Sequence, residues 1–500
     1  MPKLYDYQQK AYVDTAKSVV EHKKIIFQLS TGGGKTAIAS TITEAYIKKN
    51  KKRVLILVHR EELLRQMRRT LYDWYNIISF PITQETRKIE DAEVYVGMVE
   101  TVFRRITKKP HYLPEIGLTF IDESHIGNFF KMIPLLQSYV IGLTATPLSA
   151  KKTHPLKNYF NNIVCGPSIA ELIEKGALSQ NVTYRPKFSV DPKKFHIKHG
   201  EFDEVEMATE FSKSKHVQNA VDQFKKYGKG KAIFFNCNIQ HSKLVTEALC
   251  DAGFNARHID ANSKDRKEAL LWLSNTENAI ICNVGILTAG FDEPTIETIV
   301  MNRSTLSMPL WIQCVGRGSR ISPGKEKFIV IDLGANTLIH GDWSDTINWV
   351  DIFHNPPKKS DKVGVAPVKD CPKCEAIISA QSMICKYCSY EFPQKEEKYD
   401  VAPVELMLHI RPVEQFIEQG QGKREYYSFF MIGNNIITQT KYKTRVMSDT
   451  MASFLLKQYH EKAQEWCNLK NKKFNHFHSN LAKEHLYKEL KKLYPQWQTL

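Results

Sequence analysis

Short apolar runs alternate with helical stretches over the first 335 residues of the chain. Within residues 1–150 such runs lie at 25–27, 54–58, 94–96, 118–121 and 140–143. Continuous apolar strands separated by helices are typical of a parallel sheet that helices cover on both faces. We therefore expect a first α/β lobe over residues 1–150.

A second block repeats this layout, with expected strands at 232–235, 256–259, 279–282, 298–301 and 328–331. The block predicts a second parallel-sheet lobe over residues 229–350. Residues 151–228 are expected to form a connector and the start of that lobe.

The pattern changes after residue 350. We expect a linker rich in Pro and Lys at 351–369, a small cysteine-rich module at 370–393 and an accessory domain at 401–500. In that last domain, Ser448–Cys467 has the period of an amphipathic helix, with one face formed by Met451, Leu455, Tyr459 and Ala463.

Composition and charge indicate a globular protein and the class of its binding partner. Hydrophobic residues make up 42% of the 500 residues, enough for several cores. The chain carries 70 Lys and Arg against 54 Asp and Glu, a net charge of +16. This surplus favours a polyanionic partner, most commonly nucleic acid, although a general excess of lysine would give the same charge.

The N-terminal segment and the cysteines indicate the compartment. The first residues are polar and lack the apolar core of a signal peptide, and Val54–Val58 is far shorter than the ~20 residues that span a bilayer. Six of the ten cysteines are single and four form two Cys-x-x-Cys pairs, which indicates metal binding in a reducing compartment. We expect a cytoplasmic protein without a membrane partner.

The segment Ser30–Thr36 has the sequence of a phosphate-binding loop between a strand and a helix. Glycines there let backbone N–H groups turn toward phosphates at the helix start. Lys35 would reach the β- and γ-phosphates of ATP, and the Thr36 hydroxyl would ligate Mg²⁺. The expected cradle consists of Thr31, Gly32, Gly33 and Gly34. A glycine-rich turn is the alternative, because Leu29 stands where the strict pattern has Gly or Ala.

An acidic pair, Asp122 and Glu123, directly follows the apolar run 118–121. A carboxylate at the carboxyl end of a parallel strand is suited to hold Mg²⁺. Asp122 would bind the metal, and Glu123 would activate the attacking water. A solvated pair at a strand end is the alternative, which the upstream phosphate loop disfavours.

Together these segments resemble the superfamily 2 helicases, whose further motifs follow in order along two-thirds of the chain. In the first lobe Leu4–Gln8 resembles the adenine-reading segment, with Gln8 as the base contact. The segment His59–Leu63 resembles a nucleic-acid-backbone motif, and Val96–Val99 with Thr101 resembles the next strand contact. Arg60, Gly97 and Thr101 are thereby implied to contact nucleic acid.

A further motif of the first lobe, Thr144-Ala145-Thr146-Pro147, resembles the segment that couples hydrolysis to movement. This resemblance implies coupling roles for Thr144, Thr146 and His125.

The second lobe carries the remaining motifs. Leu287–Asp292 resembles the motif that bridges nucleic acid and nucleotide, which implies that Thr288 contacts nucleic acid while Gly290 and Asp292 contact ATP. Gln313–Arg320 matches Q-x-x-G-R-x-x-R, so Gln313 belongs to the catalytic set and Arg317 and Arg320 have the arginine-finger role. Without the other motifs, the spacing of these two arginines would be interpreted as a solvent-exposed helix face. The resemblance implies two tandem RecA-like lobes with ATP between them and single-stranded nucleic acid across both.

Four cysteines, Cys371, Cys374, Cys385 and Cys388, form two Cys-x-x-Cys pairs separated by ten residues. This spacing predicts a closed tetrahedral Zn²⁺ site of structural type, in preference to redox thiols. A module of ~24 residues has little core of its own, so the metal would supply most of its folding energy.

The order of parts resembles the RadD-like branch of bacterial DNA-repair and recombination ATPases and their phage-encoded relatives. Residues 283–294, 316–325 and 331–336 carry this likeness. It implies a monomer in the cytoplasm of a bacterium or of a phage-infected host cell. DNA is the expected partner and RNA the alternative, with a single-strand-binding protein or recombinase as a further protein partner.

Residues 401–500 interleave lysines with aromatic residues toward the C-terminus. Such a mixture suits strand binding by stacking and charge. The aromatic spacing favours a helical domain with an aromatic core and a solvated lysine face. A docking surface for a partner protein is a further alternative.

We therefore expect a DNA-stimulated ATPase that translocates on or remodels DNA in repair, recombination or replication. A different class is an ATP-gated DNA-binding mediator without processive unwinding. A third is the motor subunit of a restriction or defence system whose nuclease lies on a separate chain.

Overall fold

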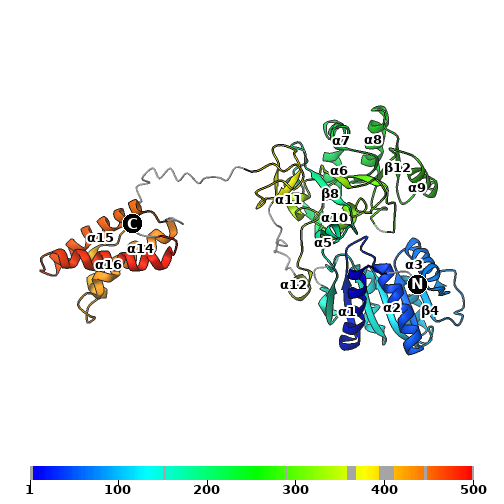
Figure 1. Ribbon diagram of the computed structural model, residues 1–500, viewed down its shortest axis with the longest axis horizontal. Coiled ribbons are helices and arrows are strands. Elements are labelled where there is room, and N and C mark those ends of the chain that lie inside the picture. Colours follow the sequence, from blue (N-terminus) through cyan, green and yellow to red (C-terminus); the bar gives the residue numbers. More distant parts are fainter. Residues whose placement is uncertain are drawn as a thin grey trace. The chain divides into compact units, whose positions relative to one another are not determined.

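The computed structural model describes residues 4–149, 154–288, 290–356, 368–392, 410–443 and 447–497. The chain divides into two compact units, Met1–Gln394 and Lys395–Leu500. The first unit holds two parallel sheets and the cysteine-rich module, and the second is helical (Figure 1).

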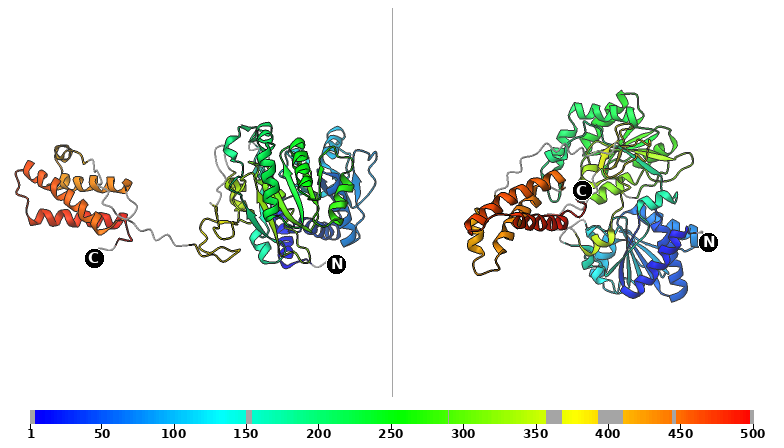
Figure 2. Two further views of the ribbon diagram at one scale, coloured as in Figure 1. Left: turned by 90° about the horizontal axis from the view of Figure 1, so that it is seen from above. Right: turned by 60° about the vertical axis from the view of Figure 1, so that its left-hand side comes forward.

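The first sheet has seven parallel strands in the order β3-β4-β2-β5-β6-β1-β7. Its helices connect consecutive strands and cover both faces (Figures 1 and 2). In chain order the lobe comprises α1 (Asp6–His22), β1 (Lys24–Gln28), α2 (Lys35–Asn50), β2 (Arg53–Val58), α3 (Glu61–Tyr75), β3 (Phe80–Ile82), β4 (Val94–Met98), α4 (Val99–Lys108), β5 (Ile116–Asp122), β6 (Tyr139–Thr144) and β7 (Asn162–Cys165).

The second sheet has six parallel strands in the order β12-β13-β11-β14-β15-β8. A two-stranded hairpin, β9 (Ile197–Lys198) with β10 (Glu201–Phe202), lies between strand β8 and helix α6 in the chain. The lobe comprises α5 (Ile169–Glu174), β8 (Gln180–Tyr184), α6 (Glu204–Phe211), α7 (Ser214–Tyr227), β11 (Lys231–Asn236), α8 (Ile239–Asp251), β12 (Ala256–Ile259), α9 (Arg266–Asn275), β13 (Ile280–Asn283), β14 (Ile296–Asn302), α10 (Met308–Val315), β15 (Lys327–Asp332), α11 (Thr337–His340) and α12 (Trp349–His354).

Strand β2 illustrates why these runs form sheets. Successive side chains point to opposite faces, so Val54, Ile56 and Val58 enter one hydrophobic cluster while Leu55 and Leu57 enter another. All five are fully buried. An unbroken apolar run is therefore typical of a strand whose sheet is covered on both faces, and the expected fold class of two α/β lobes is confirmed.

The connector contributes to both sheets. Strand β7 pairs with β1 at one edge of the first sheet, and β8 pairs with β15 at one edge of the second. Most of the linker expected at 351–369 lies outside the described residues, but its first residues belong to α12.

The cysteine-rich module contains the antiparallel pair β16 (Val368–Asp370) and β17 (Ile377–Ser379). It packs on the second lobe, where Tyr184 at the end of edge strand β8 forms an antiparallel bridge with Ala376. Arg185 pairs with Asp370 at 3.1 Å, and Glu375 bonds both Lys226 and Tyr227 on α7. The module therefore covers part of an otherwise open sheet edge.

The second unit contains α13 (Val413–Gln419), α14 (Tyr427–Lys443), α15 (Asp449–Leu469) and α16 (His476–Leu493). Leu455, Tyr459 and Ala463 of α15 are fully buried, as the amphipathic pattern predicts. Of the accessory domain expected at 401–500, residues 401–409, 444–446 and 498–500 lie outside the described residues. No helix in the described ranges combines the length and apolar character that crossing a membrane requires.

Candidate active site

Three neighbouring strands of the first sheet, β5, β6 and β1, end at one edge and deliver the predicted ATP-site loops there. The loop after β1 bonds the loop after β6 directly, because Leu29 N–H donates to Thr144 O at 3.0 Å. Gln28 Nε2 donates to Ala145 O, also at 3.0 Å. The phosphate loop, the acidic pair and the Thr144–Thr146 segment are thus brought together.

The phosphate loop has the backbone that its glycines permit. Gly32 and Gly34 have φ values of +92° and +98°, a region that residues with side chains rarely adopt. Lys35 is the first residue of α2, Thr36 is the second, and Lys35 Nζ donates to Leu29 O at 2.9 Å. Burial lowers the pKa of Lys35, while the nearby Glu123 and Asp122 carboxylates oppose that shift. An anionic phosphate at the helix start would suit this buried cation.

Gln8 lies against the phosphate loop from α1. Its Nε2 donates to Gly33 O at 3.2 Å, and its Oε1 accepts a bond from Tyr5 N–H at 3.1 Å. Tyr7 Oη donates to the same Gly33 carbonyl at 3.0 Å. Gln8 is therefore next to the expected phosphates, and its contact with adenine stays a prediction.

The acidic pair sits at the end of β5 in a strained turn, since Glu123 has φ +51°. Burial and the neighbouring Glu123 charge raise the pKa of Asp122 to about 7. Burial also opposes ionisation of Glu123, but His125, Lys35 and His59 outweigh it and lower the pKa of Glu123. Two adjacent carboxylates that titrate apart suit a division of labour between metal binding and water activation.

A series of close polar contacts links Glu123 through His125 to the segment after β6. His125 Nδ1 lies 2.9 Å from Thr144 Oγ1 and 3.4 Å from Glu123 Oε2. Thr144 Oγ1 donates to Thr146 O and accepts from Thr146 N–H, both at 3.0 Å. The structure therefore joins the three residues expected to couple hydrolysis to movement, although that role stays a prediction.

The second lobe presents its two arginines to this site from the end of α10. A Cβ atom on Gly32 would collide with Arg320 Nη1, so the Arg320 guanidinium lies directly over the phosphate loop. Arg320 Nε bonds Asp292 Oδ1 at 2.7 Å, whereas its Nη1 is buried without a partner. Asp292, an expected ATP contact, thus orients an expected arginine finger.

Arg317 is held more tightly than Arg320. It is 7% exposed and donates to the carbonyls of Thr288 and Phe291. Burial, with the Arg320 charge, lowers its pKa to about 10. Arg317 therefore ties α10 to the loop that carries Thr288, and its Nε remains without a partner.

The expected nucleic-acid residues are not equally accessible. Arg60 Nη1 donates to Ile286 O of the other lobe at 3.0 Å, and Thr288 Oγ1 donates to Gly285 O at 2.8 Å. Gly97 and Thr101 are buried, because the start of α4 packs on the end of β4. Their contacts with nucleic acid stay predictions.

A cavity of about 230 Å³ lies between the lobes beside these groups. The first lobe contributes His59, Arg60, Glu123 and His125, and the second contributes Thr288 and Gln313. His59 was not among the expected catalytic residues, yet its buried Nδ1 has no partner and burial lowers its pKa to about 4. The sequence signal was its position directly before Arg60, and only the fold shows that it shares a cavity with Glu123.

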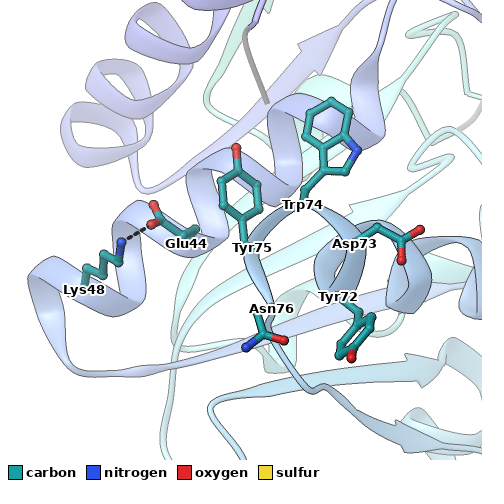
Figure 3. A pocket seen from close by; sticks show the side chains of 7 residues that line it. All are labelled: Glu44, Lys48, Tyr72, Asp73, Trp74, Tyr75 and Asn76. Atoms are coloured by element: carbon teal, nitrogen blue, oxygen red, sulfur yellow. Dashed lines mark ion pairs between the residues drawn. The ribbon is translucent and has the colours of Figure 1, made fainter. Parts of the chain in front are cut away.

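A larger and more open hollow of about 570 Å³ lies at the ends of α2 and α3 (Figure 3). The Glu44–Lys48 ion pair and the aromatic residues Tyr72, Trp74 and Tyr75 line it. None of the expected site residues is among its lining residues, so its size alone does not make it the centre of chemistry.

The four cysteines of the small module converge as a metal site requires. Their sulfur atoms all lie within 4.8 Å of one another, with Cys371 and Cys388 at 3.6 Å and Cys374 and Cys385 at 3.7 Å. A tetrahedral Zn²⁺ with bonds of ~2.3 Å separates its sulfur ligands by about 3.8 Å. The donor set and spacing therefore fit Zn²⁺.

Both cysteine knuckles have the same backbone. Glu375 and Ser389 each follow the second cysteine of a pair with a positive φ, and each donates its N–H to the carbonyl of the first. This shared turn aims both sulfurs of a pair in one direction, which is what a four-thiolate site needs.

Comparison with known proteins agrees with the motifs. Residues 1–149 match the family described as "Type III restriction enzyme, res subunit". A Lactococcus phage (isolate 7-9) protein named "51.5 kDa protein" is 26% identical over 393 residues, which cover 77% of this chain and 82% of that protein. The Saccharomyces cerevisiae protein "Putative ATP-dependent helicase IRC3" is 29% identical over 366 residues, which cover 67% of this chain and 52% of that one.

A solved structure shares the fold. "The fragment structure of a putative HsdR subunit of a type I restriction enzyme from Vibrio vulnificus YJ016" has a TM-score of 0.53 and 21% identity, and the match covers 67% of this chain and 66% of that one. This structure supports the fold alone. The family match and the curated relatives confirm the expected relationship to superfamily 2 helicases, and with it the class of helicase-type ATPase. The finer likeness to the RadD-like branch stays a prediction.

Proposed function

We propose that this protein is a DNA-dependent ATPase that uses ATP hydrolysis to move on or remodel DNA during repair, recombination or replication. The observation that carries the proposal is the opposition of Arg320 in the second lobe to Gly32 in the first. A catalytic site divided between two lobes is complete only when they close. Each round of ATP binding and hydrolysis therefore drives a relative movement of the lobes.

In the proposed reaction, residues of both lobes bind the phosphates of ATP, activate the attacking water and stabilise the transition state. Lys35 and the loop Thr31–Gly34 hold the phosphates, while Glu123 accepts a proton from the attacking water. Arg317 and Arg320 stabilise the charge that develops on the γ-phosphate. Thr36 and Asp122 would hold Mg²⁺, which neutralises phosphate charge when bound.

The nucleic-acid side of the proposal rests on where the expected contacts lie. Arg60 and Thr288 line one interlobe cavity with Glu123 and Gln313, so a strand held by both lobes would influence the catalytic groups. The net charge of +16 supports a polyanionic partner. DNA rather than RNA, and a role in repair or recombination, rest on the RadD-like sequence features.

The test is ATP hydrolysis by the purified protein alone, with single-stranded DNA, with duplex DNA and with RNA of matched length. We expect DNA, above all single-stranded DNA, to raise kcat. Lys35→Ala should abolish hydrolysis and keep DNA binding in the absence of ATP. An ATPase rate that no nucleic acid changes would refute the motor, and a stronger response to RNA would refute the choice of DNA.

A second candidate is the motor subunit of a restriction system, favoured by the family match over residues 1–149. In that case a separate nuclease chain would be needed. ATPase stimulation by duplex DNA that depends on base methylation would favour this candidate over the first.

A further inference from the structure

The helical unit 395–500 brings two charged loops together at one end. Residues 420–426 join α13 to α14, and residues 470–475 join α15 to α16. Glu425 forms an ion pair with Lys472, and Lys472 Nζ lies 5.0 Å from the ring centroid of Tyr426. The Tyr426 ring is in turn 6.0 Å from that of Phe477, so the two loops and the start of α16 form one surface.

The charge of this surface is strongly one-sided. Its two segments, 420–427 and 468–478, contain five basic residues and a single acidic one, Glu425, which Lys472 already neutralises. Lys423, Arg424, Lys470 and Lys473 are exposed. Unpaired cations gathered from two loops favour a polyanion.

The same surface leaves aromatic side chains in water. Several aromatic residues of this unit are buried, among them Phe429, Tyr459 and Trp466, which agrees with the aromatic core favoured by the sequence. Phe477 is nevertheless 57% exposed and Tyr427 is 45% exposed. Rings that stay outside an available core are suited to contact a ligand.

We propose that this basic–aromatic patch, formed by Lys423, Arg424, Tyr427, Lys470, Lys473 and Phe477, is a second binding site for single-stranded nucleic acid. The lysines and Arg424 would contact phosphates, and unpaired bases would stack on Phe477 and Tyr427. A duplex keeps its bases stacked on one another, so it would engage the charges without the rings. The inference rests on the proposed nucleic-acid motor and adds a strand contact outside the two lobes.

The experiment measures binding of the full-length protein, without ATP, to fluorescent oligothymidine and to a duplex of equal length. Phe477→Ala should weaken oligothymidine binding by at least about fivefold, the lower end of what stacking of one base contributes, and change duplex binding little. The double variant Lys470→Ala, Lys473→Ala should reduce the slope of log affinity against log salt by roughly 0.7 for each lost phosphate contact.

The matched control is Lys488→Ala with Lys491→Ala, which removes two exposed lysines farther along the same helix α16. This control variant should bind oligothymidine with nearly the affinity of the wild type, and its salt slope should stay closer to that of the wild type. Because Phe477 is largely exposed, its variant should keep the thermal unfolding temperature and the nucleic-acid-free ATPase rate of the wild type.

The outcomes separate this inference from the proposed function. If the wild type binds no nucleic acid, the motor proposal fails. If the wild type binds oligothymidine and Phe477→Ala binds it equally well, the patch proposal alone is refuted. Equal losses for oligothymidine and duplex would refute base stacking. Unchanged strand binding with lost capture of a purified single-strand-binding protein would make the patch a protein-docking surface instead.

Discussion

Gly32→Ala tests the opposition of the two lobes at the phosphate loop. An alanine at φ +92° costs about 1–2 kcal/mol of folding free energy through backbone strain alone. Its Cβ would also overlap Arg320 Nη1 so deeply that the guanidinium must retreat by about 1 Å or more. A misplacement of that size in a catalytic site costs about 10²-fold in rate.

Full loss of an arginine finger costs about 10³-fold or more in kcat. We therefore expect kcat to fall about 10²-fold in Gly32→Ala and about 10³-fold or more in Arg320→Ala. The double variant should be no worse than Arg320→Ala, because both changes act through the same guanidinium. Steady-state ATPase assays with saturating single-stranded DNA measure all three.

Gly253→Ala is the matched control, since Gly253 has φ +85° but no neighbouring atom within 4 Å of the new Cβ. It should lower the unfolding temperature by an amount similar to Gly32→Ala and leave kcat unchanged. If the losses in kcat of Gly32→Ala and Arg320→Ala multiply in the double variant, Gly32→Ala acts on the phosphate loop itself. The contact between Gly32 and Arg320 would then not be the cause of its lower rate. Equal kcat in Gly32→Ala and Gly253→Ala would refute the reasoning altogether.

Three further changes probe other parts of the first unit. His59→Ala should lower the DNA-stimulated ATPase rate about tenfold and leave the DNA-free rate nearly unchanged, because His59 lines the same cavity as Glu123. His59→Asn should recover part of the stimulation, and an equal loss of both rates in His59→Ala would contradict this role. Thr144→Val should destabilise the protein by about 1–3 kcal/mol in thermal or urea unfolding, because it leaves His125 and the Thr146 N–H without their partner. Thr144→Ser keeps the hydroxyl and should retain the stability of the wild type, and a stable Thr144→Val variant would count against this hydrogen-bond network. Metal analysis of the wild type should find one Zn²⁺ per chain, and Cys374→Ser should lose this metal and lower the unfolding temperature. Glu375→Ala should keep the metal while losing the contacts to α7, and a wild-type protein without zinc would refute the site.

The central strands were predictable from sequence and several edge strands were not. Every predicted strand overlaps a strand of the structure, and all except the edge strand β12 are central parallel strands, which bury both their faces. The strands β3, β7 and β8 were missed, and all three are sheet edges. Strand β3 contains Pro81, and β8 includes Gln180, Asn181 and Thr183, so neither has the uninterrupted apolar character that the prediction relied on.

The candidate site shows the same division between local and tertiary information. The phosphate loop and the acidic pair were recognisable because each is a short segment whose chemistry lies in consecutive residues. The place of His59 beside Glu123, and that of Arg320 over Gly32, depend on which strands are neighbours and on how the lobes meet. Sequence spacing carries no information on either contact.

The contacts between the lobes also bear on how ATP and nucleic acid would communicate. On one side Arg320 reaches Gly32, and on the other Arg60 reaches Ile286 while Gly290 packs against Glu62 and Leu63. A single interface therefore carries both the expected ATP contacts and the expected nucleic-acid contacts. If ATP and nucleic acid each bind one arrangement of the lobes more tightly than another, each ligand must alter the affinity for the other, and by thermodynamic linkage the two effects have equal size. Communication between the sites thus needs no chain of intervening residues, because the lobe interface is itself the element that both ligands would bias.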